Sequence, residues 1–442
     1  MSHEFEAAID PGISQSVRSA SRTKTEARRA ALGRIFGDPE AARQAASEAK
    51  AAVLNNLGSH LRAVESQLLK NGCHVHWAAT ADSACQIISE ICVTRSEGEP
   101  VVKGKSMVTE EIHLNDFLLQ KGVEVIETDL GEFVVQLDGD RPSHIVTPII
   151  HKTRHDVAQS FTRAGLGPHT TNPEDLASQA RRHLRQEFRS AKVGISGVNF
   201  AIAETGHLVI VENEGNNRLS TTAVKCHIAV MGIEKVLARF ADLALFLPLL
   251  ASAATGQAIT TYVNMVVGPR ASDGLDGPDE VHVVLLDNGR SRILASENRD
   301  ILKCIRCGAC LNVCPVYRVA SGHAYEHVYP GPVGSVFAPG QDGVAAFGHL
   351  AYASTLCGAC EEVCPVKIPI PDMLLRLRSQ RPLPIASPLI PVARNDRRWR
   401  ALLVVLPQVA SLASGANASW FRERGPMPAN ETPFRRWWND RS

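Results

Sequence analysis

The stretch Cys304-Ile-Arg-Cys307-Gly-Ala-Cys310-Leu-Asn-Val-Cys314-Pro315 decides how the C-terminal part of this chain is built. Its cysteines follow the order C-x2-C-x2-C-x3-C-P, in which the first three ligate one [4Fe–4S] cluster and the fourth ligates a second cluster. Three ligands on one tight loop can cap three irons of a cube, and a short helix then carries the fourth sulfur to the neighbouring site. The stretch therefore predicts two adjoining iron–sulfur clusters in an α-helical, ferredoxin-like domain.

A second copy of the motif follows, Ser354-Thr-Leu-Cys357-Gly-Ala-Cys360-Glu-Glu-Val-Cys364-Pro365. An internal repeat of this kind is typical of a pseudo-twofold pair of cluster-binding loops. Assigning the last cysteine of each copy to the other site yields two ligand sets. Cluster one takes Cys304, Cys307, Cys310 and Cys364, and cluster two takes Cys314, Cys357 and Cys360.

Cluster two is one thiolate short, because Ser354 stands where the second copy should have its leading cysteine. Three outcomes are open: a [3Fe–4S] cluster, a [4Fe–4S] cluster with an oxygen or nitrogen ligand, or an open iron. Ser354 has the position to supply an oxygen, and His323 and His327 in the intervening loop are weaker candidates. Zinc is disfavoured, since seven cysteines in this order do not divide into closed tetrahedral sets.

The residues between the cysteines suit redox tuning. Gly308 and Gly358 let backbone N–H groups approach the sulfurs, and Arg306, Lys303 and Lys367 add positive charge. Both features stabilise the reduced, more negative cluster and raise its potential.

The composition limits the class of protein. A length of 442 residues predicts more than one domain, and a formal net charge of +1 indicates no general attraction to nucleic acid. The first residues form no apolar run, and the most apolar stretch, 243–254, contains Pro248 and is too short to span a bilayer. We therefore expect a cytoplasmic protein without a transmembrane segment, which reaches a membrane only through a partner. The cysteines outside the motifs are expected to be buried thiols: Cys73, Cys85, Cys92 and Cys226.

Composition and periodicity divide the chain into four parts. Residues 1–70 predict helices, over 23–36 and 39–69. Residues 71–295 predict an α/β domain with a largely parallel sheet, because strands alternate with helices. Residues 296–380 hold the cysteines, and 381–442 form a basic tail with tryptophans that we expect to dock on a partner or to wrap over the cluster domain. Within the α/β part, strands are predicted over 74–78, 123–128, 133–137, 262–267 and 281–286 and a strand-rich region over 193–212, with helices over 82–92, 172–189 and 232–247.

Several stretches resemble known families. Residues 105–115 (KSMVTEEIHLN), 194–206 (GISGVNFAIAETG) and 211–215 (VENEG) resemble the lactate-utilisation (LUD) domain. The cysteine region and the tail ending Phe434-Arg-Arg-Trp-Trp438 resemble the lactate-utilisation protein B family. The resemblance keeps the family's order over nearly the whole chain, so it is specific.

The resemblance implies a fold and a role. The LUD fold is similar to the α/β domains of sugar-phosphate isomerases and CoA-transferases. The resemblance also implies that the chain is an iron–sulfur subunit of a three-protein complex that oxidises L-lactate to pyruvate. The implied partners are a cysteine-rich subunit of the heterodisulfide-reductase type and a free-standing LUD-domain protein. The implied cluster ligands are the seven motif cysteines, and the missing eighth cysteine is shared with the family.

Two further groups are candidates for chemistry. Lys105, Ser106 and Thr109 lie just ahead of a predicted helix, where N–H groups and a lysine can hold a carboxylate such as that of lactate. The alternative is an ordinary helix cap. Glu204, before the Thr205-Gly206 turn, is a candidate base or nucleophile, although a lone glutamate beside a turn is more often structural.

Two other functions compete with an electron-transfer subunit. A self-contained 2-hydroxy-acid oxidoreductase would bind its substrate in the LUD-like domain and pass electrons to the clusters. An iron–sulfur redox sensor would signal through cluster two, but the sequence has no recognisable DNA-binding segment.

Overall fold

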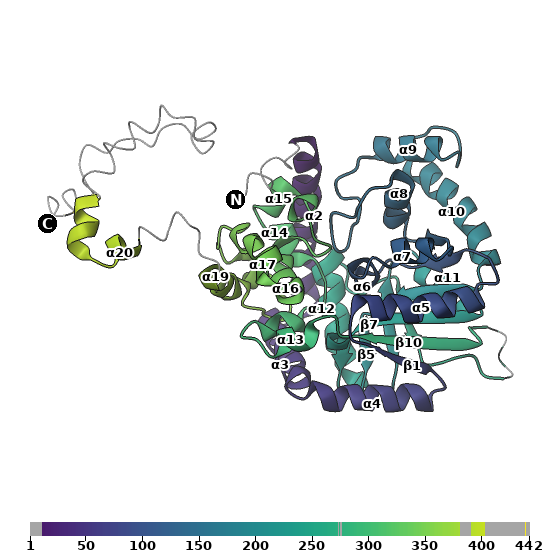
Figure 1. Ribbon diagram of the computed structural model, residues 1–442. Coiled ribbons are helices and arrows are strands. Elements are labelled where there is room, and N and C mark those ends of the chain that lie inside the picture. Colours follow the sequence, from purple (N-terminus) through teal and green to yellow (C-terminus); the bar gives the residue numbers. More distant parts are fainter. Residues whose placement is uncertain (1–10, 273, 275, 381–389, 403–437, 439–442) are drawn as a thin grey trace. The chain divides into compact units, whose positions relative to one another are not determined.

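The computed structural model describes residues 11–380, except 273 and 275, together with 390–402 and 438. Contacts divide the chain into two compact units, which are Met1–Gln380 and Arg381–Ser442. The first unit contains the α/β and cysteine regions (Figure 1). In the second unit the described residues include α20 (Ile390–Ala393).

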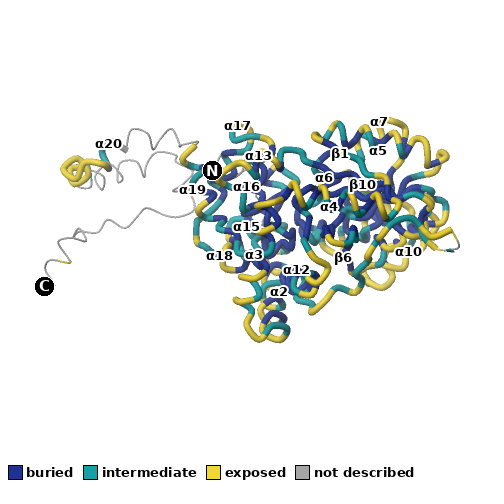
Figure 2. The backbone as a smooth tube through the Cα atoms, turned by 90° about the horizontal axis from the view of Figure 1, so that it is seen from below, coloured by how far each residue is buried: buried dark blue, intermediate teal, exposed yellow. Residues whose placement is uncertain are grey.

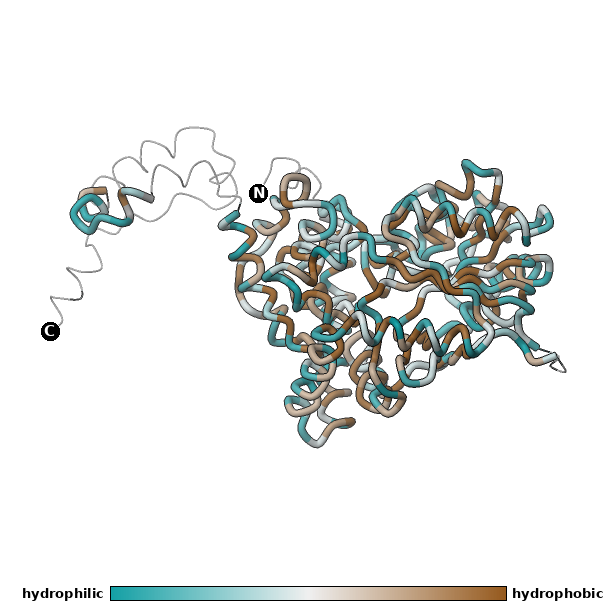
Figure 3. Tube along the Cα trace, turned by 60° about the horizontal axis from the view of Figure 1, so that its bottom comes forward, coloured by the Kyte–Doolittle hydropathy of each residue, from teal (hydrophilic) through white to brown (hydrophobic). Residues whose placement is uncertain are grey.

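A six-stranded parallel sheet organises the first unit, in the order β1-β10-β7-β4-β2-β3. Its central strands are apolar and buried, because helices or other strands cover both faces. They run as dark blue segments through Figure 2 and as brown segments through Figure 3. The strands are β1 (His74–Ala78), β2 (Val101–Lys103), β3 (Val125–Glu127), β4 (Val193–Gly197), β7 (Cys226–Gly232) and β10 (Glu280–Leu286).

Alternate residues of β7 enter two different cores, as the period of two in a strand requires. Ile228 and Val230 pack on one face against the helices that connect the first strands, whereas Ala229 and Met231 belong to the core on the other face. The helices of the first face are α5 (Ala81–Arg95), α6 (Met107–Glu111) and α7 (Leu114–Gln120). A third core lies around Val102 and is built by α8 (Leu130–Asp138), α9 (Arg154–Arg163) and α10 (Pro173–Ser190).

A second, four-stranded sheet has the order β8-β5-β6-β9 and was not expected from the sequence. Its β5–β6 hairpin turns at Thr205 and Gly206, as predicted. The strands are β5 (Phe200–Ile202), β6 (Leu208–Glu212), β8 (Val236–Leu237) and β9 (Tyr262–Val266). This sheet shares one core with the N-terminal helices, with α12 (Leu243–Thr255) and with the cysteine region.

Of the N-terminal helices, the first two contact both the α/β part and the cysteine region, and the third packs on the α/β part. They are α2 (Pro11–Ile35), α3 (Pro39–Asn55) and α4 (Leu57–Lys70). Helix α2 contacts α12 as well as two cysteine-region helices, α14 (Ala309–Val313) and α15 (Tyr317–Ala320) (Figure 1). Helix α11 (Asn216–Thr222) packs against β4 in the α/β part. The other helices are α13 (Arg290–Leu294), α16 (Gly331–Asp342), α17 (Val344–Phe347), α18 (Ala359–Glu362) and α19 (Ile370–Gln380), with short 3-10 turns between several of them.

Two predicted elements are wrong, and a third is divided in two. Residues 133–137 belong to helix α8 and not to a strand, because Asp129 caps the N-terminus and Gly139 ends the helix in the left-handed region. Residues 232–247 are not one helix: a 3-10 turn leads into β8, which pairs with β5, and α12 begins only at Leu243. The predicted helix over 39–69 is two helices separated at Asn56.

The structure confirms one further expectation, on the burial of thiols. The four cysteines outside the motifs are buried. Among the described helices, none combines the length and the apolar character needed to cross a membrane.

Candidate cluster sites and the adjoining cavity

The two cysteine loops repeat in backbone conformation as well as in sequence. Arg306 and Leu356, which precede Cys307 and Cys357, have φ of 61° and 55°. Gly308 and Gly358, which follow these cysteines, have φ of 73° and 81° and cap α14 and α18. Non-glycine residues rarely adopt positive φ, so the same unusual turn at both copies indicates one shared loop geometry.

The cysteines predicted for cluster one surround a single cavity. Cys304, Cys307, Cys310 and Cys364 all line it, although Cys364 comes from the second copy. Burial, followed by the nearby Cys304, raises the pKa of Cys307 to about 12. A buried thiolate without a counter-charge is unfavourable, whereas metal coordination deprotonates a thiol outright. Four sulfurs around one cavity are therefore a donor set that fits an iron–sulfur cluster.

The cysteines predicted for cluster two lie close enough to shift the pKa of one of their thiols. Burial, and after it the Cys314 sulfur, raises the pKa of Cys360 to about 12, and Cys357 acts in the same direction. Cys357 is exposed, whereas Cys314 and Cys360 are buried. This second group therefore reaches the surface of the unit.

Ser354 occupies the same local position as Cys304. Its Oγ accepts a hydrogen bond from the Leu356 N–H at 3.1 Å, as Cys304 Sγ accepts one from the Arg306 N–H at 3.4 Å. The two histidine candidates have other partners. His323 Nε2 lies 2.7 Å from the Arg141 carbonyl, and His327 Nε2 lies 3.0 Å from a carboxylate oxygen of Asp342.

The N-terminal helices contribute two arginines that the sequence analysis missed. Arg28 Nη2 donates to the Val363 carbonyl at 2.8 Å, and Arg43 Nε donates to the Cys364 carbonyl at 2.9 Å. Arg28 is buried, which lowers its pKa, and the nearby Cys307 and Cys364 act against this lowering. These contacts join residues more than 300 positions apart, so no local pattern in the sequence could have found them.

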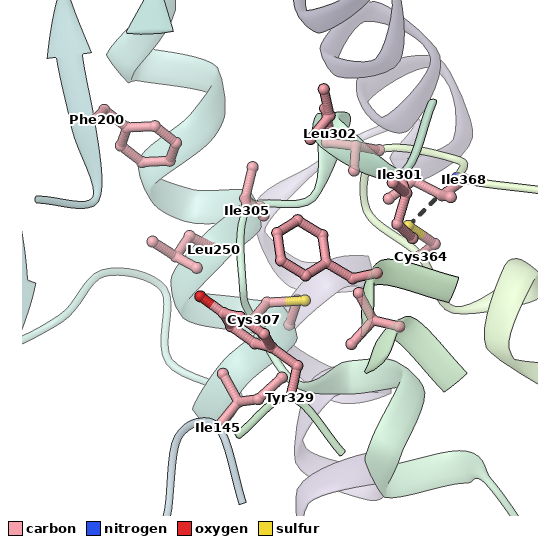
Figure 4. Close-up of a cluster of buried hydrophobic side chains, with 14 of the residues drawn as sticks. Ile145, Phe200, Leu250, Ile301, Leu302, Ile305, Cys307, Tyr329, Cys364 and Ile368 are labelled. Carbon is pink, nitrogen blue, oxygen red and sulfur yellow. Dashed lines mark hydrogen bonds between the residues drawn. The ribbon is translucent and has the colours of Figure 1, made fainter. Parts of the chain in front are cut away.

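A cavity of about 400 Å³ lies at the carboxyl ends of β2, β4 and β7, beside the predicted cluster-one cysteines. Ligands of parallel α/β sheets bind at this edge. Ile145 and Arg306 line both this cavity and the cysteine cavity. Figure 4 shows Ile145, Tyr329 and Leu250, all from the wall of the large cavity, grouped around Cys307.

Arg306 is the charged side chain that lines both cavities. Its guanidinium lies over the rings of Tyr329 and Phe337, 4.2 and 4.3 Å from their centroids, and is therefore held in orientation. Nη2 lies 3.5 Å from Glu234 Oε1, and Glu234 also binds Arg290 at 2.5 Å. Nη1 is buried and has no hydrogen-bond partner among the described residues.

Two of the three residues predicted to bind a carboxylate line the large cavity. Lys105 and Ser106 do so, but Lys105 Nζ is paired with Glu132 at 2.9 Å and Ser106 is the N-cap of α6. Thr109 is buried inside α6 and accepts a hydrogen bond from Lys103 Nζ, away from the residues that line the cavity. Glu204 is exposed and accepts a hydrogen bond from the Phe240 N–H at 2.8 Å; it is not part of the cavity.

Comparisons with known proteins agree with this architecture. A family model described as LUD domain matches residues 61–286, and one described as 4Fe-4S dicluster domain matches residues 300–368. Lactate utilization protein B of Oceanobacillus iheyensis is 39% identical over 463 residues, which cover 99% of this chain and 96% of that protein. The chain belongs to the lactate utilization protein B family.

Other relatives support the same assignment. Lactate utilization protein B of Bacillus subtilis is 43% identical over 371 residues, covering 84% of this chain and 77% of the relative. A protein of Escherichia coli K12 called "Uncharacterized electron transport protein YkgF" is 42% identical over 426 residues, covering 95% and 88%. The resemblance and the fold class inferred from the sequence are thus confirmed. As a member of the lactate utilization protein B family, the chain carries a LUD domain and an iron–sulfur domain of the dicluster type.

Proposed function

We propose that this chain is the iron–sulfur electron-transfer subunit of a complex that oxidises L-lactate to pyruvate. The observation that carries the proposal is the order in which the sites follow one another. A cavity at the ligand-binding edge of the sheet adjoins the four cysteines of cluster one, and the second cysteine group ends at the exposed Cys357. Iron–sulfur clusters held by the two groups would supply one-electron transfer.

The residues around the clusters suit this role. Cys304, Cys307, Cys310 and Cys364 would hold cluster one, and Cys314, Cys357 and Cys360 would hold cluster two with Ser354 as its fourth ligand. Arg28, Arg43 and Arg306 place positive charge or N–H groups against the first set, which favours the reduced state. The exposed Cys357 indicates that a redox partner meets the chain at cluster two.

The proposed partners are a cysteine-rich subunit of the heterodisulfide-reductase type and a free-standing LUD-domain subunit. Residues 381–442 would form the docking tail. Most of this tail, including Trp420, Trp437 and Phe434, lies outside the described residues, but Trp399 and Trp438 are described and exposed.

The test is anaerobic reduction by L-lactate, followed by EPR and by iron and sulfide analysis. The chain alone should hold about seven to eight irons. Its clusters should be reduced by L-lactate only when both partner subunits are added. No reduction in the reconstituted complex, or zinc in place of iron, would refute the proposal.

The main alternative is a self-contained 2-hydroxy-acid oxidoreductase, which the position of the cavity beside the cluster-one cysteines favours. Turnover of L-lactate by the isolated chain with an artificial electron acceptor would select this alternative. A lack of turnover by the isolated chain, with turnover by the complex, would select the electron-transfer subunit.

A further inference from the structure

The cavity beside the cysteines has an uneven distribution of charge. Three of its acidic residues, Asp129, Glu212 and Glu214, lie near β6, α8 and α11, where backbone N–H groups and side-chain amides bind them. Next to Cys304 the cavity holds three cations, Lys235, Arg290 and Arg306, against one carboxylate, that of Glu234. The wall that faces the cysteines is therefore cationic.

Three cationic groups that line the cavity have N–H donors without an acceptor among the described residues. Lys24 Nζ from α2 and Lys235 Nζ make no hydrogen bond or ion pair with the described residues, and Arg306 Nη1 is a buried donor without an acceptor. Glu234, whose Oε1 lies 3.5 Å from Arg306 Nη2, is also bound by Arg290 at 2.5 Å. Arg306 is over nine-tenths buried, with 9% of its surface exposed.

Burial of an unpaired donor or charge is unfavourable, so such groups in a cavity wall indicate a ligand that satisfies them. Burial and the neighbouring Arg306 lower the pKa of Lys235 to about 8, which reflects the cost of keeping these charges together. An anion bound between them would offset this repulsion. A guanidinium pairs well with a planar carboxylate, because two N–H groups can donate to its two oxygens.

We propose that this cavity binds a small organic carboxylate, with its anionic group held by Arg306, Lys235 and Lys24. These residues differ from the Lys105–Thr109 group that the sequence suggested. This proposal rests on the proposed function only for the choice of L-lactate and pyruvate as probes. A carboxylate bound by Arg306 would lie at the wall that the cavity shares with the cluster-one cysteines.

The test is calorimetric titration of the anaerobically purified, cluster-loaded full chain with pyruvate, L-lactate, acetate and inorganic phosphate. Pyruvate and L-lactate should bind at one site. Lys235→Met should weaken this binding about tenfold or more, as expected for a lost charge-assisted contact. Lys24→Met should weaken it in the same direction.

Lys70→Met is the matched control, because Lys70 is exposed at the end of α4 and does not line the cavity. The Lys70→Met variant should bind pyruvate and L-lactate as tightly as the parent chain does. Iron content and circular dichroism of every variant are measured, so that a folding defect is not taken for lost binding. Arg306→Lys offers a further variant that keeps the charge but loses the planar fork.

Each outcome decides the inference. No binding of any carboxylate, or equal binding by the parent and both lysine variants, would overturn it. Phosphate binding tighter than pyruvate binding would overturn the ligand class. Carboxylate binding without reduction of the clusters in the reconstituted complex would refute the proposed function and leave the binding site standing. Reduction of the clusters without carboxylate binding to this chain would refute the binding site and leave the proposed function standing.

Discussion

Gly308 and Gly358 are equivalent in the repeat but differ in their surroundings. Both have a left-handed backbone, in which an alanine costs about 1–2 kcal/mol. A Cβ on Gly308 would lie 3.0 Å from His144 Cε1, whereas a Cβ on Gly358 would meet nothing within 4 Å. We predict that both alanine variants unfold at lower denaturant concentration and that Gly308→Ala loses more. Equal losses would show that the contact with His144 is easily relieved.

Ser354 is the residue on which the type of cluster two depends. If its oxygen is a ligand, Ser354→Ala loses about one iron per chain and gains a [3Fe–4S] EPR signal, whereas Ser354→Cys keeps the iron. The neighbouring Thr355 is exposed, so Thr355→Ala is the control. The role of Ser354 is contradicted if Ser354→Ala retains the iron content and the spectrum of the parent.

Lys50 is a buried cation whose charge has a predictable pH dependence. Its Nζ donates to the carbonyls of Glu234 and Val236, and burial lowers its pKa to about 8 from the ordinary lysine value of 10.5. Between these values the unfolded chain binds more protons than the folded chain, so the free energy of unfolding rises with pH. The rise is up to about 3 kcal/mol.

The prediction concerns the difference between the parent and Lys50→Met, measured by denaturant unfolding from pH 7 to pH 10. The loss of the two hydrogen bonds lowers the stability of the variant by a constant amount. The parent should therefore gain stability relative to the variant as the pH rises through 8. A difference that does not change with pH would mean that Lys50 titrates normally in the folded chain.

At the scale of elements, α2 and α3 hold the cysteine region through arginines. Arg28→Met should lower the reduction potential of cluster one by tens of millivolts, because a positive charge beside Cys307 and Cys364 stabilises the reduced state. Arg29 is exposed on the same helix, so Arg29→Met should leave the potential unchanged. The measurement is a redox titration followed by EPR, and equal potentials in all three proteins would contradict the prediction.

Two segments adopt a secondary structure that differs from their local sequence pattern. Residues 133–137 contain two β-branched valines and suggest a strand, but the caps at Asp129 and Gly139 favour a helix. Val236 and Leu237 sit in a helix-like pattern, but pairing with β5 makes them a strand. The strands β1, β9 and β10 were predictable, because each is a short run rich in apolar residues between turn residues.

At the scale of the whole molecule, the first unit ends at Gln380. A chain that stops there should keep both clusters, since all seven motif cysteines lie before this point. If residues 381–442 form the docking tail, the shortened chain should no longer co-purify with its partner subunits. Iron analysis and affinity purification measure the two properties, and retention of the partners would place the docking surface on the first unit.

The sequence by itself determined the family, the α/β class of the LUD domain and the repeated cysteine loops. These features depend on local spacing and periodicity, which the chain displays directly. Only the tertiary structure decided that Arg28 meets Val363, that Lys24, Lys235 and Arg306 line one cavity, and that this cavity adjoins the cysteines. Such contacts join residues that are distant along the chain, and they form only because burial of a common core brings α2, the sheet edge and the cysteine loops together.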